Sequence, residues 1–176
     1  MITRFVGLDM SLSGTGVCVG MGEDVNLKTI KTKPAEFPNF YRRVDYIVNE
    51  ILLACSLQDI EMVCIEKPFI SKSSMGSNDK LIYLGMSIRK ELCYRQIPFF
   101  DVHVSHLKIY ATGKGNSKKH VMVKAAEMQG IEVKDDNQAD AYFLCQIARA
   151  IIMERNGQGT TRGKAKEVID KVTGKF

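Results

Sequence analysis

A carboxylate stands at the end of an apolar stretch that has the composition of a buried strand. Residues 5–8 (FVGL) run directly into Asp9, and a second apolar run over 16–20 follows a turn of Ser, Gly and Thr. A charge buried without a partner costs several kcal/mol. No Lys or Arg lies in the eighteen residues after Asp9. The compensating positive charge must therefore come from a distant part of the chain or from a metal ion.

The apolar spacing along the rest of the chain predicts strands that alternate with helices. Residues 4–9, 15–21 and 25–32 have strand patterns, and the turn residues over 20–24 indicate an antiparallel meander. The later segments are a helix over 38–55, a strand over 61–66, a Ser/Gly-rich loop over 70–78, a helix over 79–95, a strand over 97–104, and helices over 118–129 and 136–155. The order βββαβαβαα predicts the α/β class, with a mixed five-stranded sheet flanked by helices.

Length and composition predict a single domain. The chain has 176 residues, of which 45% are hydrophobic, and this is enough for a proper core. We assign residues 1–155 to one domain and treat the basic segment 156–176 as an extension of it. No apolar stretch approaches the roughly 20 residues that cross a bilayer, and the N-terminus has no signal-peptide pattern. We therefore expect a cytoplasmic protein with no membrane partner.

The cysteines and the charges restrict the chemistry further. Most of the cysteines lie among apolar residues, and none forms a CxxC pair, which predicts reduced core thiols and argues against a zinc site. The net charge is +5, and residues 105–126 hold five lysines and no acid. Residues 155–176 add six basic residues against two acids. Basic clusters of this kind suit a polyanion such as DNA, although a solvated surface explains the charge equally well.

Acidic residues occur where the predicted elements end or begin. Asp9 ends the first strand and Glu66 ends the fourth. Asp136 and Asp140 are four residues apart at the start of the last long helix, so they share one of its faces. Each has an ordinary explanation. A helix dipole favours acids at its N-terminus, Glu66 can pair with Lys67, and Asp9 can cap the turn at Ser11–Ser13. Taken together they predict a carboxylate cluster, whose repulsion Mg²⁺ or Mn²⁺ would relieve.

Four short motifs in a fixed order carry a resemblance to a known family. They are VGLDMSLSGTGV with Asp9, VCIEKPF with Glu66, LKIYATGKGNSKKHVMV with its lysines, and DDNQADAYFLCQIA with Asp140, and they span residues 4–152. The chain resembles the RuvC family of Holliday junction resolvases in the ribonuclease H-like superfamily, most closely the short RuvC-like enzymes of bacteriophages. The resemblance implies the ribonuclease H-like fold and a crossover junction endodeoxyribonuclease, working in the cytoplasm of a bacterium or a phage-infected host.

The last motif departs from the bacterial pattern. Bacterial members carry Asp-x-x-Asp, whereas the position three before Asp140 is Asn137 in this chain. The fungal mitochondrial relatives use an acid four positions before, which matches Asp136. The resemblance thus implies Asp136 as the fourth metal ligand beside Asp9, Glu66 and Asp140, with Asp135 and Asn137 as competing positions.

The resemblance also implies roles for basic and aromatic residues. Lys118 lies three before Val121, as does the family's catalytic lysine, and Lys119 is the alternative. Phe69 stands where bacterial enzymes insert an aromatic wedge into the junction, and packing in the core is an equally good interpretation of it. The expected DNA-binding residues are Phe69, Lys72, Lys108, Lys114, Lys118, Lys119 and Lys124.

The implied reaction is phosphodiester hydrolysis with two Mg²⁺ ions per active site, for which Mn²⁺ substitutes. Asp9 would bridge the ions, one activating a water and the other stabilising the leaving 3′ oxygen, and Lys118 would neutralise charge at the phosphate. A four-way junction is nearly two-fold symmetric, so a homodimer joined along the helix over 79–95 would make paired nicks. The implied partner is branched DNA, chiefly four-way junctions, with no obligate helicase.

Two other classes of function also deserve weight. Actin-like ATPases and sugar kinases begin with a similar strand and Gly-containing turn, but they have two such lobes and this chain has one. A non-catalytic module that binds branched DNA would require one of the acids to be missing, and all of them are present. Metal-dependent nicking of a synthetic junction distinguishes these classes.

Overall fold

The strands form one mixed sheet. The computed structural model describes residues 3–56, 59–68 and 75–174, and over these residues it forms a five-stranded sheet in the order β3-β2-β1-β4-β5. The strands are β1 (Arg4–Asp9), β2 (Gly14–Met21), β3 (Asp24–Lys31), β4 (Ile60–Glu66) and β5 (Phe99–Val102). The first three form an antiparallel meander, while β4 runs parallel to β1 and β5 parallel to β4. The predicted α/β class with a mixed five-stranded sheet is confirmed.

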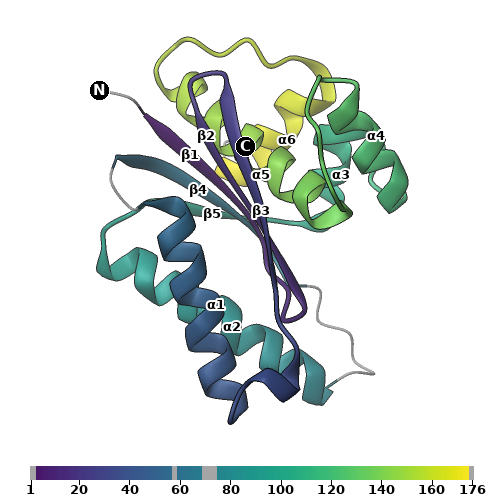
Figure 1. The fold of residues 1–176 in the computed structure, drawn as a ribbon. Coiled ribbons are helices and arrows are strands. Elements are labelled where there is room, and N and C mark those ends of the chain that lie inside the picture. The colour runs from purple at the N-terminus through teal and green to yellow at the C-terminus, as the bar shows by residue number, and fades with distance from the viewer. Residues whose placement is uncertain (1–2, 57–58, 69–74, 175–176) are drawn as a thin grey trace.

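Helices cover both faces of this sheet, as Figure 1 shows. A short 3₁₀ turn (Pro34–Glu36) precedes α1 (Phe40–Cys55), which lies with α2 (Met75–Tyr94) on one face. The other face carries α3 (Val104–Thr112), α4 (Lys119–Glu127), α5 (Asp136–Arg155) and α6 (Gly163–Thr173). None of the helices in the described ranges is long and apolar enough to span a membrane.

Alternation along the strands divides the core between the two faces. On β1, Val6 and Leu8 join the cluster beneath α1 and α2, whereas Phe5 joins the cluster beneath α5. Successive side chains of a strand point to opposite faces, and this is why neighbours separate in this way. Helix α5 is buried along most of its length and crosses β1 and β2 at their centre. Its N-terminal turn is thereby held near the carboxyl end of β1.

Glycines in β1 and β2 allow this close approach. A Cβ added to Gly7 would lie 2.0 Å from the carbonyl oxygen of Ala141, and one on Gly16 would lie 2.1 Å from that of Asn137. Both obstacles are backbone atoms of α5, so no side-chain rotation relieves the clash. Gly16 also pairs with Asp9 across the β1–β2 ladder. The absent side chains therefore set the position of α5 relative to Asp9.

Gly16→Ala should consequently destabilise the protein by about 3 kcal/mol, near the upper end for overpacking, because α5 must move away from the sheet. Urea unfolding at pH 7 measures this change. Gly115→Ala is the matched control, since a Cβ there meets Ile109 at 3.4 Å, an ordinary contact. Equal unfolding midpoints for the two variants would contradict this account of the packing.

The structure corrects four parts of the predicted secondary structure. The strand expected over 97–104 is limited to Phe99–Val102, because residue 104 already begins α3. The loop expected over 70–78 is helical from residue 75, in the first turn of α2, and its earlier part lies outside the described residues. Both α3 and α6 were absent from the prediction. Charged residues interrupt the apolar spacing of α6, which nevertheless buries Val168 and Ile169 in the core beneath α5.

Candidate active site

Two neighbouring parallel strands bring the first two acids together. Leu8 of β1 lies opposite Ile65 of β4, so Asp9 and Glu66, each the next residue, end their strands side by side. The carboxyl ends of parallel strands meet at the same edge of a sheet, where open α/β sheets place their sites. Asp9 is on the α5 side of the sheet, as Gly7 is, which turns its carboxylate towards the N-terminal turns of α5.

The electrostatics show that the four predicted acids share this edge. Burial raises the pKa of Asp9 well above its usual value, and the charges of Glu66, Asp140 and Asp136 raise it further. Burial and then the charge of Asp140 raise the pKa of Glu66 to about 7. Burial and then the charge of Asp136 raise the pKa of Asp140 to about 6. We call Asp9, Glu66, Asp136 and Asp140 the acidic cluster.

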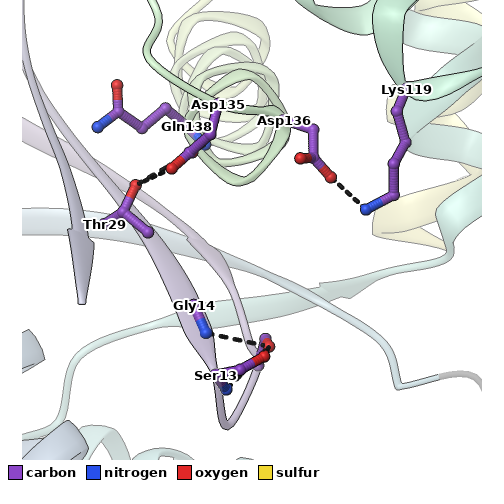
Figure 2. Close-up of polar contacts among 8 residues, drawn as sticks. Ser13, Gly14, Thr29, Lys119, Asp135, Asp136 and Gln138 are labelled. Carbon is purple, nitrogen blue, oxygen red and sulfur yellow. Dashed lines mark hydrogen bonds and ion pairs between the residues drawn. The ribbon is translucent and has the colours of Figure 1, made fainter. Parts of the chain in front are cut away.

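Lysines from two further helices lie beside the acidic cluster. The positive charges of Lys108 on α3 and Lys119 on α4 both lower the pKa of Glu66 and of Asp140, which offsets part of the rise. The ammonium group of Lys119 forms an ion pair with Asp136, which raises the pKa of Lys119 (Figure 2). The charge of Lys119, from a distant part of the chain, also acts on Asp9, but the pKa of Asp9 remains well above its usual value. The position of Lys108 was not apparent from spacing alone, because α3 was not predicted.

Asp135 and Asp136 face opposite sides of the α5 N-terminus, as Figure 2 shows. Asp135 is the N-cap residue, and its carboxylate accepts a hydrogen bond from the backbone N–H of Gln138 at 3.0 Å. It also accepts one from the hydroxyl of Thr29 on β3 at 2.9 Å. Asp135 is therefore occupied in capping α5 and joining it to the sheet, whereas Asp136 faces α4.

The turn after Asp9 does not use the Asp9 carboxylate as its cap. The hydroxyl of Ser11 accepts hydrogen bonds from the backbone N–H groups of Ser13 and Gly14, both at 3.3 Å. The hydroxyl of Thr15 donates to the carbonyl oxygen of Ser11 at 2.5 Å. Because the turn satisfies its own polar groups, the ordinary explanation for Asp9 as a turn cap is removed.

The acidic cluster fits a divalent cation in its donor chemistry. Oδ1 of Asp140 is buried and has no hydrogen-bond partner, and a buried acceptor of this kind requires an explanation such as an ion. Carboxylate oxygens that repel one another are the ligands that Mg²⁺ and Mn²⁺ prefer. Within the described ranges, no three Asp, Glu, His or Cys side chains already converge as a formed metal-binding group, and Asp136 is turned to Lys119.

Three of the remaining predicted site residues are exposed lysines, and two lie outside the described residues. Lys118 is the exposed N-cap residue of α4 and has no side-chain capping hydrogen bond. Lys114 and Lys124 are exposed on the segment that joins α3 to α4 and on α4 itself. Phe69 and Lys72 lie outside the described residues.

The strand order and the helical layers are those of a RuvC-like, ribonuclease H-like fold. The chain is similar to Thermus thermophilus RuvC solved in complex with a Holliday junction substrate, with a TM-score of 0.68, 16% identity, and 89% of this chain and 97% of that chain covered. A second Thermus thermophilus RuvC structure gives a TM-score of 0.66 and 18% identity over 89% of this chain and 98% of that chain.

A mitochondrial resolvase shows the same architecture. The yeast mitochondrial Holliday junction resolvase Ydc2 aligns with a TM-score of 0.53 and 11% identity, over 99% of this chain and 85% of that chain. No protein-family model and no curated protein matches the chain by sequence. The RuvC-like fold implied by the sequence motifs is confirmed.

The raised pKa of Glu66 predicts how stability depends on pH. Since the folded-state pKa is about 7 and the ordinary value is 4.5, the metal-free native state binds this proton more tightly than the unfolded chain. Stability must then fall as the pH rises from about 4.5 to 7. Glu66→Gln should stabilise the protein at pH 8 by about 2 kcal/mol and have little effect at pH 4. Urea unfolding in EDTA at both pH values measures this, and equal effects at pH 4 and 8 would contradict it.

Proposed function

We propose that the protein is a structure-selective endodeoxyribonuclease that resolves Holliday junctions and other branched DNA with paired symmetric nicks. The observation that carries the proposal is the acidic cluster, four partly buried carboxylates at the carboxyl edge of β1 and β4. The shared fold with junction resolvases supports it. In this proposal the protein acts as a crossover junction endodeoxyribonuclease in the cytoplasm of a bacterium or a phage-infected host.

Asp9, Glu66, Asp136 and Asp140 would hold two Mg²⁺ ions, or Mn²⁺ in their place, and such ions lower the pKa of water and stabilise a leaving oxygen when bound. Asp9 and Asp140 each interact electrostatically with the other three acids, so both lie well within the cluster. Gly7 and Gly16 hold α5 close enough to the sheet for Asp140 to face Asp9. The lysines of α3 and α4 supply positive charge where a scissile phosphate would approach.

Lys119 is the better placed of the two candidate catalytic lysines. Its ammonium group contacts Asp136 and interacts with Asp140 and Asp9. Lys118 caps α4 and faces solvent. We assign the phosphate-neutralising role to Lys119 and a DNA-backbone contact to Lys118, together with Lys108, Lys114 and Lys124. A comparison of the nicking rates of Lys119→Ala and Lys118→Ala tests the division, and a slower Lys118→Ala would reverse it.

Paired nicking requires two active sites, and α2 offers a surface for a homodimer. Tyr83 and Met86 of α2 are 43% and 65% exposed, and Tyr41 of α1 is 60% exposed. The rings of Tyr41 and Tyr83 pack edge to face with centroids 5.4 Å apart. Large apolar groups exposed side by side are typical of an interface core. Tyr83→Glu should therefore convert a dimer to a monomer in light scattering.

A cleavage panel tests the proposed function. Synthetic four-way, three-way, Y-shaped and linear DNA are incubated with the protein in Mg²⁺, Mn²⁺ or EDTA, and the ends are mapped. We expect symmetric nicks in the four-way junction, slower cutting of the other branched forms, no cutting of linear DNA and no activity in EDTA. Binding without nicking would instead support a non-catalytic module, and nucleotide hydrolysis without nicking would support a phosphotransferase.

A further inference from the structure

A second group of basic side chains lies outside the acidic cluster. A cavity of about 450 Å³ opens between the end of β4, the start of α3 and the last turn of α6, within the size range of small-ligand sites. Its polar lining is Lys67, Asp101, His103, Ser105, His106 and Lys171. We call this cavity the basic pocket.

The charges that line the basic pocket leave it positive. Its acid, Asp101, is neutralised by Arg89 of α2, which donates to one carboxylate oxygen from Nη2 at 2.6 Å and from Nε at 3.1 Å. Among the described residues, no carboxylate forms an ion pair with Lys67 or Lys171. Two lysine ammonium groups therefore remain to act on whatever enters the basic pocket.

The two histidines add hydrogen-bond donors to the same space. Nδ1 of His103 accepts the backbone N–H of Ser105 at 3.3 Å, so the neutral ring carries its proton on Nε2. The ring of His106 lies with its centroid 5.9 Å from that of His103. Burial, then Lys171 and then His103 lower the pKa of His106, which places Lys171 close to that ring. An anion in the basic pocket would act in the opposite direction and favour the charged imidazole.

Two elements connect the basic pocket to the acidic cluster, the end of β4 and helix α3. Lys67 directly follows Glu66, and its backbone N–H donates to the carbonyl oxygen of Val102 at 2.8 Å. On α3, Lys108 acts on Glu66 and Asp140 while His106 lines the basic pocket. These residues are two apart, or about 200° around a helix, so they face different sides. A DNA strand that crosses the end of β4 would reach both the acidic cluster and the basic pocket.

We propose that the basic pocket binds a backbone phosphate of a DNA arm beside the scissile position, an assignment that rests on the proposed nuclease function. Lys67 and Lys171 supply the charge, and the imidazole N–H groups of His103 and His106 supply directional donors, as phosphate contacts require. The C-terminal helix α6 is thereby part of the DNA-binding surface. Phosphate contacts position DNA and read no sequence, so the contact is expected on every branched substrate.

Junction binding by Lys171→Ala tests the proposal. Measured in Ca²⁺ by fluorescence anisotropy across a salt series, its Kd at low salt should rise on the order of fivefold, and the salt slope should flatten by about one. Lys171→Arg should restore most of the affinity. Lys28→Ala removes an exposed lysine of β3 that pairs with Glu50 of α1 on the opposite face of the sheet, and this variant should bind as the wild type does.

A second measurement separates this inference from the proposed function. Inorganic phosphate, titrated against chloride of equal ionic strength, should shift the ring C–H signals of His103 and His106 in the wild type and much less in Lys171→Ala. If the wild type binds junctions and Lys171→Ala binds them as tightly as Lys28→Ala does, the basic pocket does not contact DNA. If the wild type binds no branched DNA, the proposed function fails. If inorganic phosphate still shifts the histidine ring signals of such a protein, the basic pocket binds free phosphate, and the proposed contact with the DNA backbone is overturned.

Discussion

Replacement of Asp9 by Asn is expected to lower the rate of junction nicking by at least about 10³-fold while leaving junction binding intact. Asp9 ends β1 beside Glu66, and the charges of Glu66, Asp140 and Asp136 act on it, so it belongs to the acidic cluster. The amide keeps the size of the side chain and removes its charge. Binding should tighten slightly, because a negative charge that faces the DNA backbone is lost. Single-turnover nicking in Mg²⁺ and anisotropy in Ca²⁺ measure the two effects.

The matched control for this experiment is Asp24→Asn, an exposed acid at the far end of the β2–β3 hairpin. It should nick and bind as the wild type does. The metal-free Asp9→Asn protein should also be more stable than the wild type at pH 8, since a raised carboxyl pKa marks a charge that the native state tolerates poorly. A folded Asp9→Asn protein that loses binding along with nicking would contradict the metal-ligand role.

The fold was largely accessible from the sequence because its central elements have strong patterns. The meander of β1 to β3 combines short apolar runs with a turn at Gly22, whose φ of 64° suits glycine. Glu66 was placed correctly because β4 is a continuous buried run that stops at a charge. The close approach of α5 to the sheet was not predictable, because it depends on the absence of side chains at Gly7 and Gly16.

The basic side of the site was harder to predict. Helix α3 has one fully buried residue, Leu107, so it gives little periodic signal, yet it carries Lys108 to the acids and His106 to the basic pocket. Helix α6 buries two adjacent residues, Val168 and Ile169, between charged neighbours. Both helices are stabilised by packing against the rest of the fold rather than by their own pattern. A run of lysines therefore predicted DNA binding without indicating which lysine reaches the acids.

Asp136→Asn is expected to slow Mg²⁺-dependent nicking nearly as much as Asp140→Asn, whereas Asp135→Asn should be mild. Because α5 begins at residue 136, Asp136 and Asp140 lie about 40° apart around its axis. Asp136 raises the pKa of Asp140, and its carboxylate faces Lys119 rather than the sheet. The amide in Asp136→Asn would remove one of the four charges that offset the cations, and it would release Lys119. Excess Mn²⁺ should restore part of the rate of this variant.

Asp135 provides the matched control, because its neighbours specify a different role. Asn caps helices about as well as Asp, and its amide oxygen can still accept from Gln138 and Thr29, so Asp135→Asn should keep both stability and nicking. Asp135→Ala removes the cap and should cost about 1 kcal/mol in urea unfolding, with nicking retained at low temperature. If Asp135→Asn loses Mg²⁺-dependent nicking while Asp136→Asn keeps it, the fourth ligand is Asp135. In that case the first turn of α5 would have to rotate when the cations bind, breaking the contact with Thr29.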